Sequence, residues 1–278
     1  MAVKLYTEAY IQNIANAIRE KNGLTTRYKV GQMANAILNI PTGGDLLALM
    51  TGSEQFDLTD STVPTTALLI PSYMFYRNAN VTNVGFDSVL TIGANAFQGC
   101  GYIENINFPN VTEIQEKAFL ECRRSSYTTT STISLPKVVT IGQEAFREFN
   151  IDNDTFDFNL PECTTIGLGA FRVVNQNYSF AVRKVNLPKV QTIGNYGFQR
   201  CEATDFIIGP NCSSIGVQCF ESAIITNLHV QATTPPTVGN SNLGTGTITH
   251  IYVPSASVSA YKGASGWSTY ASIIEAEP

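Results

Sequence analysis

The chain contains little charge and few of the side chains that carry out chemistry. Only 14% of its 278 residues are charged, and it has two histidines and one tryptophan. Globular proteins usually have about a quarter of their residues charged. The net charge of -5 and the pI near 5.1 argue against nucleic-acid binding, which requires basic patches.

Long apolar runs are missing as well. The longest lies near Ala67–Pro71, far short of the roughly 20 residues that a membrane-spanning helix needs. The first 20 residues carry Glu8, Asn13 and Asn16 where a signal peptide has its apolar stretch. We therefore expect no membrane span and no signal peptide, and a protein made in the cytoplasm.

What the sequence does contain is an internal repeat. An Ile is followed by a Phe five residues later in seven units, from Ile70 and Phe75 to Ile215 and Phe220, at steps of 22, 22, 27, 25, 27 and 22 residues. The other pairs are Ile92–Phe97, Ile114–Phe119, Ile141–Phe146, Ile166–Phe171 and Ile193–Phe198. Because one such unit cannot bury its apolar face alone, the units are expected to stack into a solenoid.

Each unit is predicted to contain two short extended pieces and one helical turn. Residues Phe156–Leu160 alternate between apolar and polar, which is typical of a strand. Phe206–Ile208 and Leu228–Val230 fill the same slot in later units. A proline such as Pro161 then ends the strand, since it has no N–H for the ladder.

The repeat resembles a known family. The segment Val89–Cys100 is similar to the BspA-type leucine-rich repeat, whose units read V-x-x-I-G-x-x-A-F-x-x-C. The resemblance extends from about Ala67 to Pro236, and Ile248–Ile274 is similar to the terminal unit of the family. It implies a leucine-rich-repeat-like solenoid, mostly β with short helical turns, that serves binding or structure and not catalysis.

A different module is predicted before the repeats. Thr7 can cap a helix over Glu8–Asn22, and a second short helix is expected near Gly31–Asn39, followed by a linker at Pro41–Gly44. Together they form a small α-helical hairpin. The apolar stripe of the first helix consists of Ile11, Ile14, Ala15 and Ile18.

The chain thus divides into three parts. Residues 1–44 are an attachment or oligomerisation module, residues 45–246 are the solenoid with an N-terminal capping region at 45–66, and residues 247–278 are a C-terminal capping unit. The first part has a charge balance of +3 and the remainder one of -8. A helical hairpin of about 40 residues is near the lower limit for independent folding. It should therefore dock on the solenoid, on copies of itself or on a larger particle.

Two stretches of this module, Ile11–Gly23 and Tyr28–Ile37, resemble a segment common at the start of phage tail and baseplate-associated proteins. The resemblance implies that residues 1–44 contact other tail or baseplate proteins. It also implies a protein of the virion that is made in the host cytoplasm. By analogy with phage tails, a homotrimer is the first expectation for its assembly.

The cysteines and histidines do not form a recognisable catalytic or metal site. Each cysteine keeps phase with the repeat, so all six are expected to be free thiols that pack as small hydrophobes: Cys100, Cys122, Cys163, Cys201, Cys212 and Cys219. No Cys-x-x-Cys pair is present, which argues against zinc. His229 and His250 lie in or beside strand slots, and nothing in the sequence places a nucleophile near either.

An acidic stretch contains Asp152, Asp154 and Asp157. Counted from Asp152, the sixth and twelfth positions are Asp157 and Cys163, where a calcium loop needs Gly and Glu. A solvated loop is therefore favoured over a calcium site. We predict no catalytic residue, no metal and no cofactor.

Three consecutive units exceed the 22-residue step by five, three and five residues. The extra residues are expected in loops at Arg123–Thr132, Glu148–Thr155 and Val173–Arg183, which stacking should bring side by side. Insertions in repeat proteins often form the binding face, although they can equally be tolerated decoration. The predicted recognition surface consists of Arg123, Arg124, Tyr127, Asn150, Asp152, Asn175, Asn177 and Tyr178.

These observations favour a non-enzymatic adhesion protein that binds a host cell-surface glycan or protein. The first hypothesis is a phage or prophage tail-associated host-recognition protein. The second is a bacterial cell-surface or secreted BspA-type adhesin whose signal peptide precedes this sequence. The third is a glycan depolymerase, which would need a convergent pair of carboxylates that no feature of the sequence specifies.

Overall fold

The computed structural model describes residues 56–59, 66–101, 103–122, 132–175, 178, 180–239 and 242–278, except for the side chains of residues 56, 57 and 152–154. The two helices predicted in residues 1–44 lie outside the described residues. So do the linker and most of the capping region. In the described part, no helix is both long and apolar enough to cross a membrane.

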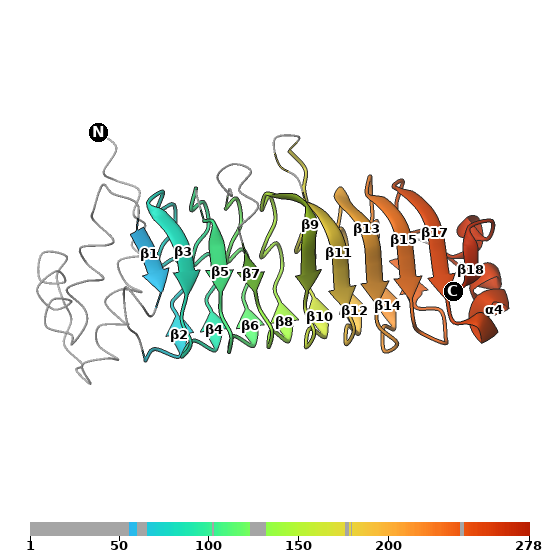
Figure 1. Cartoon of the computed structure of the whole chain (residues 1–278), viewed down its shortest axis with the longest axis horizontal. Coiled ribbons are helices and arrows are strands. Elements are labelled where there is room, and N and C mark those ends of the chain that lie inside the picture. Colours follow the sequence, from blue (N-terminus) through green and yellow to red (C-terminus); the bar gives the residue numbers. More distant parts are fainter. Residues whose placement is uncertain are drawn as a thin grey trace, which may run out of the picture.

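The described chain is a solenoid of parallel strands, in which most turns contribute one short and one longer strand (Figure 1). The short strands build an eight-stranded sheet. They are β2 (Leu69–Ile70), β4 (Thr91–Ile92), β6 (Glu113–Ile114), β8 (Thr140–Ile141), β10 (Thr165–Ile166), β12 (Thr192–Ile193), β14 (Ser214–Ile215) and β16 (Thr237–Val238).

The other strands form two further parallel sheets, and we call them the longer strands because all but β7 have three or more residues. The first contains β1 (Phe56–Thr59), β3 (Val81–Gly85), β5 (Asn105–Asn107) and β7 (Ile133–Ser134). The second contains β9 (Ile151–Asn159), β11 (Phe180–Leu187), β13 (Cys201–Ile208), β15 (Ile224–Val230), β17 (Thr247–Val253) and β18 (Ile274–Ala276). The repeat solenoid predicted from the sequence is therefore confirmed.

The repeat residues form the core. The seven repeat Phe rings stack from turn to turn with centroid separations of 5.0–6.3 Å. The repeat Ile side chains are at most 4% exposed. Apolar burial along the whole axis is therefore continuous, as stacking requires.

An eighth turn follows the seven predicted units. Val238 in β16 pairs with Ile215, and buried Leu243 lies five residues further on, as Phe does after Ile in earlier turns. The sequence search missed this turn because Val and Leu replace the Ile and Phe on which it depended.

The helical turn expected after each short strand is instead a series of tight turns. Lys117 and Glu121 have φ angles of 55° and 57°, which an α-helix does not contain. The N–H groups alternate in direction. Phe97 N donates to Ala118 O of the next turn at 2.8 Å, whereas Ala96 N donates to Gly93 O of its own turn at 3.2 Å. This alternation satisfies the backbone without a helix and ties successive turns together.

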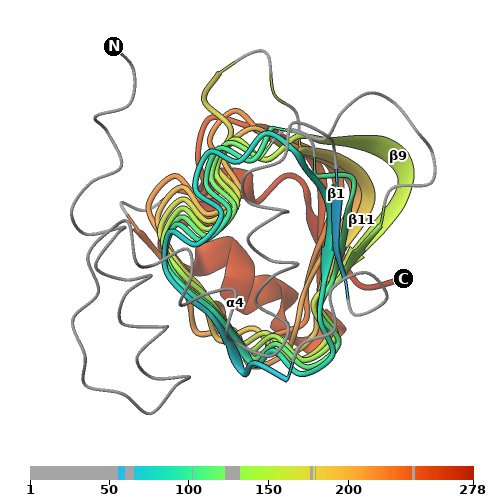
Figure 2. The same ribbon diagram turned by 90° about the vertical axis from the view of Figure 1, so that its left-hand side faces the viewer.

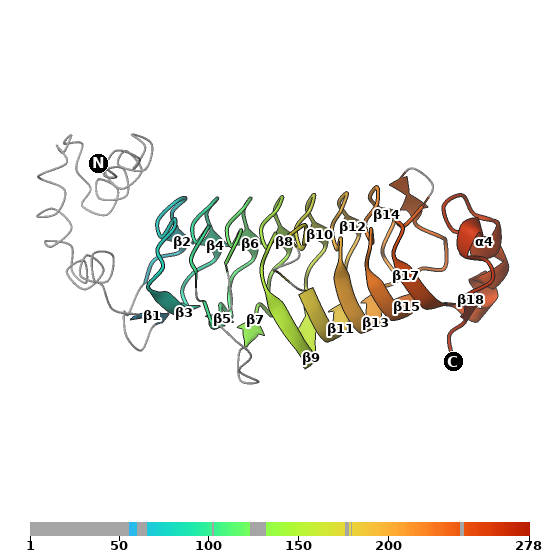
Figure 3. The same ribbon diagram turned by 90° about the horizontal axis from the view of Figure 1, so that it is seen from above.

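The C-terminal unit closes the solenoid, as its resemblance to the family's terminal unit implies. It contains η2 (Ser255–Ser257), α4 (Val258–Gly263), η3 (Ser268–Tyr270) and β18. The side chains of Tyr261 and Trp267 are fully buried. Tyr261 Oη donates to Ala232 O and Trp267 Nε1 to Pro236 O, both at 2.8 Å. The last turn therefore has its open end covered (Figure 3).

The extra residues of the longer units are not all in loops. The segment predicted as a loop at Glu148–Thr155 enters β9 at Ile151, and the Val173–Arg183 segment enters β11 at Phe180. Ile151 pairs with Phe180, which pairs with Cys201. The extra length therefore extends the strands, because the next turns offer backbone partners. Seen along the axis, β9 and β11 project beyond the other turns (Figure 2).

Candidate functional site

The predicted recognition surface is described only in part. Asn150 precedes β9 and is half-buried, Asn175 is exposed, and Tyr178 is half-buried. Asp152 lies in β9, but its side chain is outside the description. Arg123, Arg124, Tyr127 and Asn177 lie outside the described residues.

The three described residues come from neighbouring turns that β9 and β11 join. Tyr178 N donates to Asn175 O at 3.1 Å, which closes the turn before β11. The Tyr178 ring packs against the core. It therefore helps to anchor this turn, and it offers less free apolar area than a fully exposed ring would.

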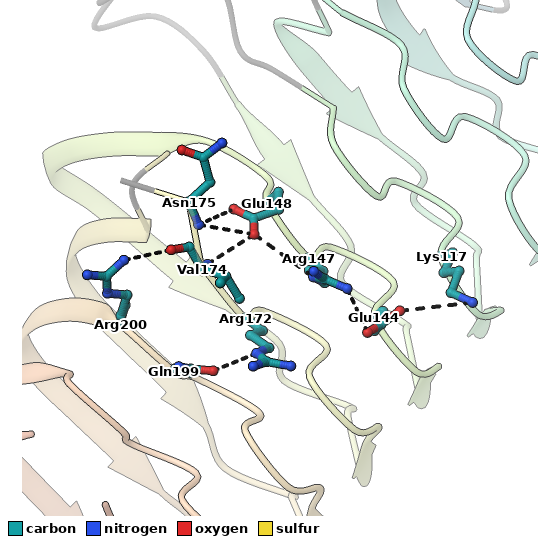
Figure 4. A network of polar contacts seen from close by, with 9 residues as sticks. All are labelled: Lys117, Glu144, Arg147, Glu148, Arg172, Val174, Asn175, Gln199 and Arg200. Carbon is teal, nitrogen blue, oxygen red and sulfur yellow. Dashed lines mark hydrogen bonds and ion pairs between the residues drawn. The ribbon is translucent and has the colours of Figure 1, made fainter. Parts of the chain in front are cut away.

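A buried carboxylate holds the same turn from below. Glu148 is 5% exposed, and its carboxylate accepts hydrogen bonds from Val174 N at 3.0 Å and from Asn175 N at 3.3 Å. A buried carboxylate is costly unless it is paired or hydrogen-bonded. Here the backbone N–H groups satisfy it, and in return they are fixed in place (Figure 4).

Charged side chains continue from Glu148 along the turns. Arg147 Nε lies 3.9 Å from Glu148 Oε1, and Arg147 Nη1 donates to Glu144 Oε1 at 3.0 Å. Lys117 Nζ lies 4.0 Å from the other oxygen of Glu144. Figure 4 shows this row of alternating charges crossing from turn to turn. The sequence search missed the row because Lys117 lies on an earlier turn of the solenoid than Glu144, Arg147 and Glu148 and meets them only when the turns stack.

Two arginines also lie near the turn at Val174 and Asn175 that Glu148 holds. Arg172 Nε donates to Gln199 Oε1 at 2.5 Å, and its guanidinium lies 4.7 Å from the centre of the Tyr196 ring. Arg200 Nη1 donates to Val174 O at 2.7 Å. Glu148 thus holds the N–H groups of the turn and Arg200 holds its Val174 carbonyl. The geometry of the turn is therefore preorganised.

The acidic stretch is a strand in this structure, and the solvated loop expected there is wrong for Asp152–Asp157. Asp157 lies in β9, and its Oδ2 accepts a hydrogen bond from Arg183 Nη2 of β11 at 2.6 Å. No group of three or more His, Cys, Asp or Glu side chains able to hold a metal occurs among the described residues.

The outer face of the longer strands carries a row of polar side chains. Asn105 Nδ2 donates to Asn83 Oδ1 at 2.5 Å, and Asn227 Nδ2 donates to Asp205 Oδ1 at 2.8 Å. In both pairs the residues occupy the same register position in neighbouring strands. At these two places the face is therefore polar, and its side chains already hydrogen-bond to each other.

Both histidines contact carboxylates near the C-terminal strand. His229 Nδ1 lies 2.8 Å from Glu277 Oε1, and His250 Nδ1 lies 3.2 Å from Glu275 Oε1. The rings also pack against Tyr252, at centroid distances of 5.0 and 5.7 Å. These contacts link β15 and β17 to the end of the chain.

The cysteines are buried at their repeat positions, as predicted, and are free thiols. Burial raises the pKa of Cys100 and of Cys163 to about 12 and that of Cys212 to about 11. Cys100 Sγ donates to Phe75 O at 3.0 Å, and Cys122 Sγ donates to Phe97 O at 2.9 Å. Neutral thiols of this kind pack and cap carbonyls, and they are poor nucleophiles or metal ligands at neutral pH.

The fold and this site define a parallel repeat solenoid in which insertions on one side extend two strands, β9 and β11. Hydrogen bonds to Glu148 and Arg200 hold the turn that precedes β11. The family described as the BspA type leucine rich repeat region matches residues 53–177 and 139–264, with six copies. The chain belongs to this family, and the repeats indicate a binding or adhesion protein. A search of curated proteins finds no match.

Proposed function

We propose that this protein is a non-enzymatic, tail-associated host-recognition protein of a phage or prophage. The solenoid presents one side, the recognition flank, to a cell-surface glycan or protein. The recognition flank is the side that carries the insertions at Arg123–Thr132, Glu148–Thr155 and Val173–Arg183. Residues 1–44 attach the solenoid to the particle. One observation carries the recognition part: Glu148 and Arg200 hold both the N–H and the C=O groups of the Val174 turn. Loops positioned by a rigid scaffold are the usual carriers of binding function.

A turn held in this way binds with a smaller entropy cost than a free loop. The neighbouring Asn175 is exposed, and its amide can bond sugar hydroxyls or peptide groups. The resemblance of Ile11–Gly23 and Tyr28–Ile37 to the start of phage tail proteins supports the particle setting. A bacterial surface adhesin would use the same flank, so the two hypotheses differ in attachment and not in recognition.

The recognition part is tested by shortening the insertions. Five residues are removed from Arg123–Thr132 and five from Val173–Ser179, while β9 and β11 are left intact. The expected result is a folded protein that no longer adsorbs to host cells. The matched control replaces Thr192 with Ala on the short-strand sheet, where Thr192 is exposed. Undiminished adsorption by the shortened protein would place recognition elsewhere, most simply on the long-strand face.

The attachment part is tested separately by deleting residues 1–44. The solenoid should remain folded by circular dichroism, because the core of the described residues lies within residues 58–274. It should lose assembly, first of all as a trimer, and should no longer join tail particles. A full-length protein that is strictly monomeric in light scattering and binds no tail component would contradict this part. An assay for polysaccharide cleavage should detect none.

A further inference from the structure

Arg172 is held in a fixed orientation by neutral groups. Its Nε donates to Gln199 Oε1, and its guanidinium stacks over the Tyr196 ring. A guanidinium has five N–H donors, and the contact with Gln199 uses the one on Nε. The four N–H groups on the two Nη atoms make no hydrogen bond within the described residues.

Arg200, on the next turn, is also held by a neutral group. The only hydrogen bond of its side chain within the described part of the chain runs from Nη1 to Val174 O. Arg172 bonds Gln199, which directly precedes Arg200, and Arg200 bonds Val174, two residues after Arg172. The two arginines are thus cross-linked through each other's turns (Figure 4).

The positive charge of this pair is not neutralised by a described carboxylate. Arg147 and Arg183 each have a carboxylate oxygen within 3.0 Å, whereas no described carboxylate oxygen lies within 4.0 Å of Arg172 or Arg200. The acidic neighbours are occupied. Glu148 accepts from the Val174 turn, and Glu221 accepts from Thr245 N at 2.8 Å and Thr245 Oγ1 at 2.6 Å.

An arginine pair that is oriented but not neutralised is suited to bind an anion. Guanidinium groups bind carboxylates through two parallel hydrogen bonds. Near the pair lie the half-buried Gln199, the exposed residues Val174 and Asn175, and the Tyr196 ring under Arg172. Amides beside guanidinium groups complement the hydroxyls and the carboxylate of an acidic sugar.

We propose that Arg172 and Arg200 bind the carboxylate groups of an acidic, uronic-acid-containing cell-surface polysaccharide. This inference rests on the proposed function and names the ligand class of its recognition flank. Affinity per site is modest and falls with salt, because the contact is charge-assisted and the two arginines are partly open to solvent. Several copies on one particle would strengthen attachment.

The test uses the full-length protein and immobilised polygalacturonate at low salt. The double variant Arg172→Gln/Arg200→Gln should bind roughly tenfold or more weakly, as expected for loss of about 1.4 kcal/mol or more. The matched control is Arg183→Gln/Lys189→Gln, which removes the same charge from side chains that already pair with Asp157 and Glu162. The control should bind as the parent does.

Chemical variants of the probe separate the possible ligands. Methyl-esterified polygalacturonate, which lacks the charge, should not bind. Stronger binding of dextran sulfate would identify sulfate as the ligand group and overturn the carboxylate assignment. Stronger binding of poly-glutamate would identify a protein ligand and overturn the glycan assignment. An equal loss of affinity in both double variants would show that only net charge matters, and it would overturn the assignment of Arg172 and Arg200 as the binding site.

Cell adsorption distinguishes this inference from the proposed function. If the insertion-shortened protein fails to adsorb but the Arg172→Gln/Arg200→Gln protein adsorbs normally, the recognition flank stands and the acidic-glycan site is wrong. If the shortened protein adsorbs normally, the recognition flank itself is wrong. The Arg172→Gln/Arg200→Gln protein should keep the parent's circular dichroism spectrum and melting temperature, and the shortened protein should keep the circular dichroism spectrum.

Discussion

At the scale of single residues, the buried phenylalanine column carries much of the stability of the fold. Phe146 is 2% exposed and stacks on Phe119 and Phe171 at centroid distances of 5.0 and 5.3 Å. Phe149 meets it edge-on at 5.5 Å. Such a ring loses contacts on every side when it is truncated.

Phe146→Ala should therefore lower the free energy of unfolding by roughly 3–5 kcal/mol. The measurement is urea denaturation followed by circular dichroism. Leu168→Ala is the control, because Leu168 is 39% exposed, and a change there should cost less than about 1 kcal/mol. Equal losses at the two positions would show that the Phe column is not the core.

The buried thiols predict how the protein responds to alkali. Burial raises the pKa of the Cys100, Cys163 and Cys212 thiols in the folded state. A raised folded-state pKa means that the stabilisation is complete below the unfolded pKa, about 8.5, and is lost as the pH rises through the folded values. The urea midpoint should fall between about pH 9 and pH 12.

Thiol counting checks the same cysteines directly. At pH 8 the native protein should react slowly with a thiol reagent, and the denatured, non-reduced protein should show six free thiols. Fewer than six, with a matching disulfide in the mass spectrum, would contradict the packing role of these residues.

At the scale of elements, Glu148 positions the turn at Val174 and Asn175, which lies in the third insertion just before β11. It comes from one turn of the solenoid and accepts hydrogen bonds from the backbone of the next. A hydrogen bond to a charged group contributes about 1.5–3 kcal/mol. Glu148→Ala leaves the N–H groups of Val174 and Asn175 without this partner.

Hydrogen exchange at Val174 and Asn175 should therefore become roughly tenfold or more faster in Glu148→Ala. Glu162→Ala is the matched control, since Glu162 pairs with Lys189 in an exposed ion pair at 2.7 Å. Such pairs contribute little. Unchanged exchange in Glu148→Ala would mean that other contacts hold the turn.

The elements also show what spacing can and cannot predict. The apolar positions of Phe156–Leu160, Phe206–Ile208 and Leu228–Val230 predicted strands that the structure contains in β9, β13 and β15. The prediction of a helical turn in each unit was wrong, because hydrophobic spacing does not reveal the left-handed backbone at Lys117 and Glu121. The spacing also counts extra residues without showing whether they loop out or extend a strand.

At the scale of the whole molecule, the solenoid depends on its end cap. Trp267 is fully buried and donates to Pro236 O, and it meets Tyr261 edge-on at 5.0 Å. A solenoid end without a cap exposes apolar core and a strand edge. The cap therefore protects the last turn from aggregation as well as from unfolding.

Trp267→Ala should cost roughly 3–5 kcal/mol and should increase aggregation on heating. Light scattering during a thermal ramp measures the second effect. Tyr270→Phe is the control, as it removes only the hydrogen bond from Tyr270 Oη to Gly244 O at 3.1 Å, which contributes about 1 kcal/mol. A Trp267→Ala protein that melts and scatters like the parent would show that the cap is dispensable.

The sequence by itself determined the repeat, its inward residues and its terminal cap, because stacking places the same demand on every turn and so leaves a periodic pattern. Tertiary structure alone decided what the insertions do. Glu148, Val174 and Arg200 meet only after three turns have stacked. Their contacts span 26 residues without any periodic signal. The neutral partners of Arg172, Gln199 and Tyr196, likewise come beside it only because the turns stack.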